Sequence, residues 1–305
     1  MQINKINGLI AAPFTPFCKD GSVNLMVIKA YSEKLKKDGV KGVFVCGTTG
    51  EGMFMTLDER KNVASEWMKY QTENFKIIVH VGTTSAIQSK ELAKHAQEIG
   101  AYAFGCMGPV FLQPGRLEEL VGFCTEVASG APDLPFYYYH IPSVTGINLS
   151  MSGFIELAKT KIPNLAGIKF TDNNLMEFQK CINLDNGKWD ILHGYDELLL
   201  AGLAFGAKGA VGSTYNFMAP LYNGIIEDFK NRDIEAARKK QAQSVDIIDV
   251  LLKNSGALVA GKTLMKSFGV DCGPCRFPLK TLSKVESEKL INEIKEIGFF
   301  ANDLM

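Results

Sequence analysis

The chain has 305 residues, 46% of them hydrophobic, and its 33 basic and 33 acidic residues balance. Such a composition is typical of a globular protein, and the balanced charge argues against a nucleic-acid or anionic-membrane surface. The longest apolar stretch, residues 198–207, is interrupted by glycine and falls well short of the roughly twenty residues that span a bilayer. No signal peptide is visible, and seven cysteines without a disulfide pattern favour reduced thiols. We therefore expect a cytoplasmic protein.

Eight short apolar segments, rich in β-branched and aromatic residues, recur along the first two thirds of the chain. They are apolar throughout rather than alternating, as is typical of strands that are covered on both faces. The predicted strands are residues 8–12, 42–46, 75–81, 101–104, 136–140, 165–169, 189–193 and 209–212.

Helical patterns separate and follow these strands. Thr56 and Glu59 form a capping box that predicts a helix through residue 70. Pro220 favours the first turn of another helix. After about residue 231 the strand pattern stops, and long amphipathic helices are predicted at 234–254 and 283–297.

Strand and helix alternating eight times predict an α/β fold, the (β/α)8 or TIM barrel. A doubly wound open sheet is the alternative, but the first strand-helix turn lacks the G-x-G-x-x-G fingerprint. We expect two parts: a catalytic barrel over residues 1–230 and a helical C-terminal extension over residues 231–305.

Two motifs in the extension resemble known functional sequences. Residues 256–263 match the phosphate-loop pattern G-x-x-x-x-G-K-T, but the preceding segment is helical, so we predict a plain helix-helix turn. Cys272 and Cys275 form a C-x-x-C pair without the βαβ context of a redox site or a second pair for zinc. We expect both motifs to lie away from the strand ends and to be inert, and we predict no metal site.

In a barrel of this kind the chemistry lies at the carboxyl ends of the strands. Residues 47–52, GTTGEG, follow the second strand and combine a tight turn with the hydroxyls of Thr48 and Thr49. This combination suits a carboxylate or a phosphate, although a structural turn explains it equally well.

Lys169 lies inside the sixth apolar strand, where a charged amine is costly to bury. It is either a neutral nucleophile that forms a Schiff base with a carbonyl substrate, or a lysine that extends out to solvent. Strand alternation places Tyr137 and Tyr139 on one face of the fifth strand and Tyr138 and His140 on the other. A tyrosine facing the lysine could relay protons, but packing is the more usual role of tyrosine rings.

Together these segments resemble the N-acetylneuraminate lyase and dihydrodipicolinate synthase family, class I aldolases on (β/α)8 barrels. The resemblance covers essentially the whole chain and is greatest to the eukaryotic-type lyase branch. The matching motifs are GTTGEG at 47–52, YYYHIPSVTG at 137–146, GIKFTDNNL at 167–175, HGYDE at 193–197 and GSTYN at 212–216.

The resemblance implies a role for individual residues. Lys169 would form the Schiff base, Tyr139 would shuttle protons, and Thr48 and Thr49 would hold the pyruvate carboxylate. The residues expected to line the site for the sugar chain are Thr171, Gly194, Asp196, Glu197 and Ser213.

The implied reaction is cleavage of sialic acid to N-acetylmannosamine and pyruvate, with no cofactor. The alternatives are another pyruvate-dependent aldolase, either synthase-like or acting on a keto-sugar acid, and a non-catalytic barrel that binds sialic acid or pyruvate. The family also implies a homotetramer.

The chain departs from parts of the family pattern. His140 stands where many bacterial relatives have asparagine, and Phe111 and Leu112 lie where many carry a tyrosine that reaches the neighbouring subunit. Val144 occupies the position where synthases carry a carboxylate-binding arginine. Since valine cannot bind a carboxylate, this position favours the lyase over the synthase.

Overall fold

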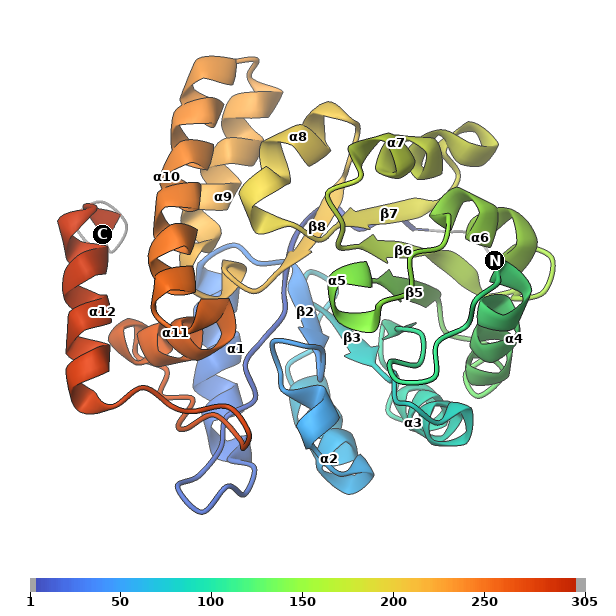
Figure 1. The fold of residues 1–305 in the computed structure, drawn as a ribbon, viewed down its shortest axis with the longest axis horizontal. Coiled ribbons are helices and arrows are strands. Elements are labelled where there is room, and N and C mark those ends of the chain that lie inside the picture. The colour runs from blue at the N-terminus through green and yellow to red at the C-terminus, as the bar shows by residue number, and fades with distance from the viewer. Residues whose placement is uncertain (1–3, 300–305) are drawn as a thin grey trace.

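The computed structural model describes residues 4–299 and forms a closed barrel of eight parallel strands in sequential order (Figure 1). The TIM barrel predicted from the alternation of strands and helices is confirmed. The strands are β1 (Gly8–Ala11), β2 (Gly42–Val45), β3 (Lys76–His80), β4 (Ala103–Cys106), β5 (Phe136–His140), β6 (Leu165–Phe170), β7 (Asp190–His193) and β8 (Gly209–Gly212).

Alternation along the strands divides the apolar residues into two cores. Side chains such as Ile10, Phe44 and Ile78 form a small cluster inside the barrel. Their neighbours along the strands, including Leu9 and Val43, pack outward against the helices in a larger cluster. Both faces of every strand are therefore covered, which explains why the strands are continuous apolar segments in the sequence.

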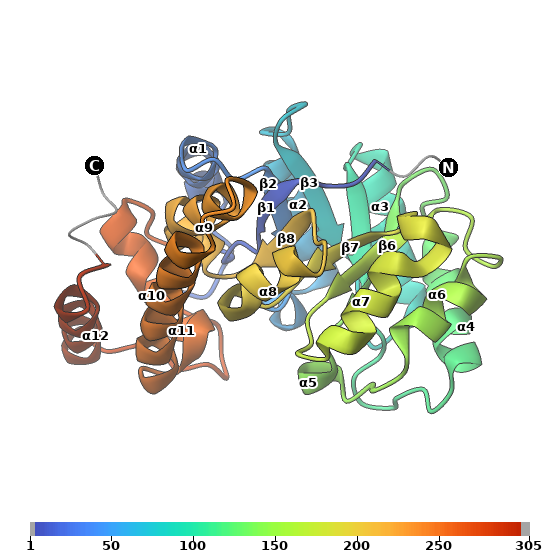
Figure 2. The ribbon, with the colours of Figure 1, turned by 90° about the horizontal axis from the view of Figure 1, so that it is seen from above.

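Helices surround the barrel, and three of them form an appendage on one side of it (Figures 1 and 2). The helices around the barrel are α1 (Ile28–Lys37), α2 (Leu57–Met68), α3 (Ala86–Glu98), α4 (Leu117–Ala128), α5 (Pro142–Thr145), α6 (Met151–Ala158), α7 (Leu175–Asn183), α8 (Leu199–Ala204) and α9 (Tyr215–Lys230). The appendage consists of α10 (Ile234–Lys253), α11 (Gly256–Met265) and α12 (Lys284–Glu296), with α10 packed along α9. No helix within residues 4–299 is long and apolar enough to cross a membrane.

The predicted strand ends agree with the structure to within two residues, and the capping box that begins α2 is present. The prediction for Pro220 was wrong, because α9 begins five residues earlier, at Tyr215. The side chain of Asn216 donates to the carbonyl oxygens of Ala12 and Ser213 at 2.7 Å and fixes this first turn. Burial of residues 215–219 against the barrel outweighs the cost of a proline inside the helix.

The prediction of a helix-helix turn at residues 256–263 was also wrong, because these residues lie within α11. The turn itself is confined to residues 254–255, where Ser255 has a φ of 77°. Val259, Ala260 and Leu264 are buried, so the stretch forms a helix that packs by its apolar side chains.

Candidate active site

The buried amine of Lys169 lies at the centre of the site. Tyr139 of β5 and Leu192 of β7 are its register partners, so the Lys169 side chain points into the barrel with theirs. It is only 4% exposed, and its Nζ lies 3.8 Å from the ring centre of Tyr139 and 4.3 Å from that of Phe44. The structure therefore excludes the interpretation in which the Lys169 side chain extends out to solvent.

The protonation state of Lys169 follows from its burial among these aromatic rings. Burial lowers the pKa of its amine from 10.5 to about 7, and the distant charge of Asp196 offsets this only in part. Within residues 4–299 the amine has no hydrogen bond or ion pair that would hold it protonated. A large fraction of the amine is therefore neutral and nucleophilic near neutral pH.

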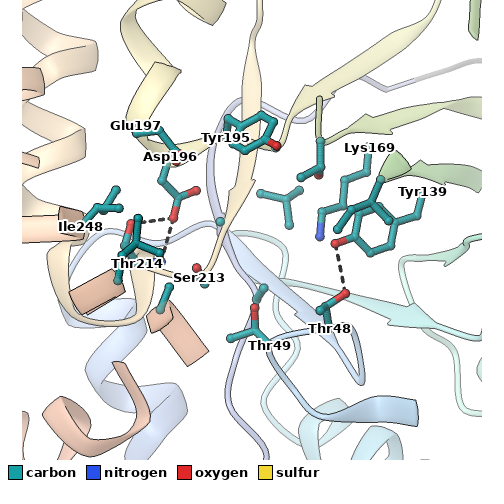
Figure 3. A pocket seen from close by; sticks show the side chains of 18 residues that line it. Thr48, Thr49, Tyr139, Lys169, Tyr195, Asp196, Glu197, Ser213, Thr214 and Ile248 are labelled. Carbon is teal, nitrogen blue, oxygen red and sulfur yellow. Dashed lines mark hydrogen bonds between the residues drawn. The ribbon is translucent and has the colours of Figure 1, made fainter. Parts of the chain in front are cut away.

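The hydroxyl of Tyr139 lies 3.3 Å from the hydroxyl of Thr48, within hydrogen-bond distance (Figure 3). Burial raises the pKa of Tyr139 to about 12, so the phenol is protonated at neutral pH. Tyr137 shares the same face but lies deeper in the barrel and donates to the carboxylate of Asp190 at 2.8 Å. Of the three consecutive tyrosines, Tyr139 is therefore the one beside the lysine.

The loop after β2 brings Thr48 and Thr49 to the same cavity (Figure 3). It turns sharply, with left-handed backbone at Cys46 and Glu51. At Gly52 a Cβ would lie 1.9 Å from the carbonyl oxygen of Cys46, so only glycine fits there. The loop is a tight turn, as expected, and it also presents two hydroxyls to the cavity.

Polar groups from the segments after β7 and β8 form the opposite side of the cavity (Figure 3). The Oδ2 of Asp196 accepts hydrogen bonds from the backbone amide and hydroxyl of Thr214, at 2.8 and 2.6 Å. The Oδ1 of Asp196 is buried with no partner, and burial raises the pKa of this carboxyl to about 6. Burial also raises the pKa of Glu197. This side of the cavity therefore offers hydrogen-bond acceptors to a polyhydroxylated ligand.

The cavity has a volume of about 230 Å³ and contains every site residue predicted from the sequence. Thr171 lies beside the backbone of Gly194. A Cβ on Gly194 would lie 2.0 Å from the hydroxyl oxygen of Thr171. The residues that the structure brings together here are Thr48, Thr49, Tyr139, Lys169, Thr171, Gly194, Asp196, Glu197 and Ser213.

Several residues that line the cavity were not predicted from the sequence. Tyr195 and Thr214 lie within the motifs HGYDE and GSTYN, so their positions could have been inferred. Ile248, Leu252 and Ala257 come from the appendage and are apolar, so no chemical pattern marked them. The helices after residue 230 therefore form part of the cavity wall.

The expectation that both appendage motifs lie away from the strand ends was wrong for Lys262. Its amine donates to Glu51 at 2.7 Å, in the loop directly after β2. The reason is that α11 packs against this loop, a long-range contact that a local motif does not reveal. By contrast, burial raises the pKa of Cys272 to about 12 and that of Cys275 to about 11, which disfavours reactive thiolates.

His140 points away from the cavity, toward the surrounding helices. Its Nε2 lies 3.6 Å from Asp172, and its ring packs against Phe170. Within residues 4–299, no group of three or more histidine, cysteine, aspartate or glutamate side chains is arranged to hold a metal ion.

The barrel agrees with comparisons to known proteins. The chain belongs to the dihydrodipicolinate synthetase family, whose sequence profile matches residues 5–297. It is 40% identical over 279 residues to N-acetylneuraminate lyase of Gallus gallus, covering 90% of this chain and 91% of that protein.

Two solved structures are similarly close. N-acetylneuraminate lyase of Proteus mirabilis superposes with a TM-score of 0.94 at 41% identity, over 97% of this chain and 100% of that one. The N-acetylneuraminate lyase, or sialic acid aldolase, of Aliivibrio salmonicida gives a TM-score of 0.94 at 40% identity, over 97% and 98%.

Proposed function

We propose that this protein is an aldolase that cleaves N-acetylneuraminate to N-acetylmannosamine and pyruvate through an imine on Lys169. The observation that carries the proposal is the Lys169 amine, buried among aromatic rings with a pKa lowered to about 7, in a cavity that also holds Tyr139. The similarity to N-acetylneuraminate lyases over more than nine tenths of the chain supports the choice of substrate.

The neutral amine of Lys169 adds to the keto carbon of the open-chain sugar acid, and loss of water leaves a protonated imine. The imine withdraws electrons, so the C3–C4 bond breaks once the C4 hydroxyl gives up its proton. The N-acetylmannosamine aldehyde departs, and an enamine of pyruvate remains on the lysine. Protonation at C3 and hydrolysis release pyruvate and restore the amine, so this chemistry requires no metal or dissociable cofactor.

Tyr139 is the group that we assign to proton transfer. Its hydroxyl is held at 3.3 Å from Thr48, and its ring lies against the amine of Lys169. With a pKa of about 12 it does not remove a proton by itself at neutral pH. We assign it a relay, which accepts the C4 proton while passing its own toward the substrate carboxylate.

The two ends of the cavity suit the two ends of the substrate. Thr48 and Thr49 provide hydroxyls on the side of Lys169 and Tyr139, where the pyruvate carboxylate would be held. The groups assigned to the hydroxyls of the sugar chain line the same cavity: Thr171, Gly194, Asp196, Glu197 and Ser213. The unpartnered Oδ1 of Asp196 is an acceptor that a substrate hydroxyl would satisfy.

The synthase alternative would require a group that binds the carboxylate of a second substrate. Val144 lies in the short helix α5 and is 51% exposed. Because its side chain is a hydrocarbon, it provides neither a charge nor a hydrogen bond. The non-catalytic alternative does not account for a buried lysine beside a protonated tyrosine, because a binding barrel requires neither.

The substrate is tested by measuring two reactions on one preparation. Cleavage of N-acetylneuraminate is expected to show a much higher kcat/KM than condensation of pyruvate with aspartate semialdehyde. The opposite order would replace the lyase with a synthase. Absence of both reactions in a folded preparation would favour the binding barrel.

We also propose a cytoplasmic homotetramer. All seven cysteines are free thiols, which supports a reducing compartment. Phe111 and Leu112, which follow β4, are 86% and 82% exposed, and such adjacent apolar side chains support burial against another subunit.

A further inference from the structure

A buried ion pair joins the appendage to the loop after β2. The amine of Lys262, in α11, donates to one oxygen of Glu51 at 2.7 Å, and the two side chains are 1% and 0% exposed. The other oxygen of Glu51 accepts from the backbone amide of Arg276 at 2.6 Å. Both oxygens of this carboxylate are therefore held by groups from beyond residue 230.

A second set of contacts continues this connection. The guanidinium of Arg276 donates to both carboxylate oxygens of Glu59 at 2.7 Å and to the carbonyl of Phe54 at 2.9 Å. The Nζ of Lys262 and the Cζ of Arg276 each lie 4.4 Å from the centre of the Phe17 ring. The segment that follows the two threonines is thus fixed to the appendage at several points.

Glu51 is connected to the threonines through the backbone. Its amide donates to the carbonyl of Thr48 at 3.0 Å, and it holds a left-handed conformation with a φ of 54°. On the other side of the loop, the hydroxyl of Thr15 donates to the carbonyl of Gly50 at 2.6 Å. The position of Thr48, and with it the contact to Tyr139, therefore depends on how Glu51 is held.

A buried ion pair is weak evidence for a stabilising role, because desolvating two charges offsets much of their attraction. We propose that Lys262 is a positioning residue. It holds Glu51 so that the hydroxyls of Thr48 and Thr49 contact the pyruvate carboxylate. This inference rests on the proposed function, in which those hydroxyls bind that carboxylate. It replaces the expectation that Lys262 is inert.

The test uses Lys262→Met, which keeps most of the length of the side chain and removes its charge. The quantity measured is the pyruvate concentration that gives half-maximal borohydride trapping on the enzyme. We expect this concentration to rise about tenfold, the effect of weakening one hydrogen bond to a carboxylate. The maximal trapping rate should change less than twofold, because the amine of Lys169 is untouched.

The matched control is Lys266→Met, one turn further along. Lys266 pairs with Asp271 at 3.1 Å on the surface, with side chains 75% and 59% exposed. Its half-saturating pyruvate concentration should equal that of the wild type. An equal rise in both variants would overturn the proposal, as would wild-type behaviour of Lys262→Met.

Lys262→Met leaves the carboxylate of Glu51 buried without its charge partner, which can destabilise the fold. The double variant Glu51→Gln/Lys262→Met removes both charges and is expected to fold, as checked by thermal unfolding. It should show the same rise in half-saturating pyruvate. Wild-type saturation in this variant, or its failure to fold, would assign the pair a purely structural role. If the wild type itself traps no pyruvate, the proposed function fails instead.

Discussion

Lys169 differs from the other lysines of the chain in what surrounds its amine. Several lysines that the structure describes pair with carboxylates near the surface, as Lys61 does with Glu91 at 2.5 Å. Lys169 has two aromatic rings instead, and burial lowers its pKa to about 7. Lysine amines in this chain therefore differ in pKa, and for Lys169 the difference comes from desolvation.

This pKa predicts a pH dependence for the first half of the reaction. The free amine is the nucleophile, so imine formation should fall about tenfold per pH unit below pH 7 and level off above it. Exchange of the pyruvate methyl protons with solvent, followed by NMR, reports this step without the sugar. If the exchange rate instead begins to fall below pH 10, Lys169 keeps its ordinary pKa.

The hydroxyl of Tyr139 provides a second prediction. Tyr139→Phe keeps the ring against Lys169 but removes the hydroxyl that would relay protons in the transition state. We expect kcat for sialic acid cleavage to fall about 10²–10⁴-fold with little change in KM. Steady-state kinetics measure both constants. Tyr138→Phe, in which the altered ring lies outside the barrel, is the matched control and should keep wild-type turnover. Unchanged turnover in Tyr139→Phe would mean that its ring only packs.

At the scale of elements, the strands could be predicted from the sequence because each is a continuous apolar segment between turn residues. The site motifs could be placed because the carboxyl ends of parallel strands meet at one end of a barrel. Pro220 misled the prediction, since a local proline preference is weaker than the tertiary packing of α9. The helix α11 was missed because its glycines matched a phosphate-loop pattern.

Contacts between distant elements could not be predicted. Lys262 and Glu51 are 211 residues apart, and nothing local in either segment indicates their pairing. The same holds for Ile248 and Leu252, which are apolar residues of an amphipathic helix and reach the cavity only through the packing of α10. These contacts depend on the folded arrangement of whole helices rather than on any motif.

The contact between β8 and the segment after β7 gives a prediction. A Cβ at Gly212 would lie 1.8 Å from the Oδ1 of Asp196, so Gly212→Ala must displace that carboxylate. We expect kcat/KM for sialic acid to fall at least about tenfold, because a buried hydrogen bond to a charged group is lost. Pyruvate trapping on Lys169 should persist, since the amine is unaffected.

Gly122→Ala is the matched control. Gly122 lies within α4, where a Cβ would meet nothing within 4 Å, so the substitution should leave both activities unchanged. Equal activity of Gly212→Ala and Gly122→Ala toward sialic acid would contradict the assignment of Asp196 to the sugar chain.

At the scale of the whole molecule, barrel and appendage act together on the cavity. The boundary that we predict at residues 230–231 falls between α9 and α10, yet Ile248, Leu252 and Ala257 line the cavity from beyond it. We propose that the extension completes the substrate cavity rather than forming an independent functional unit.

The number of subunits is a further prediction. Light scattering at micromolar concentration should give a mass about four times the 33.5 kDa of one chain. A monomer under these conditions would contradict the tetramer and would leave Phe111 and Leu112 exposed without a partner subunit.

Borohydride reduction in the presence of pyruvate tests whether Lys169 forms the imine. Peptide mapping should place one reduced pyruvate on Lys169, with loss of activity in proportion to labelling. Lys169→Ala should be neither labelled nor active, whereas Lys161→Ala, at an exposed lysine just before β6, should be both. Labelling at a different lysine, together with an active Lys169→Ala, would contradict the mechanism.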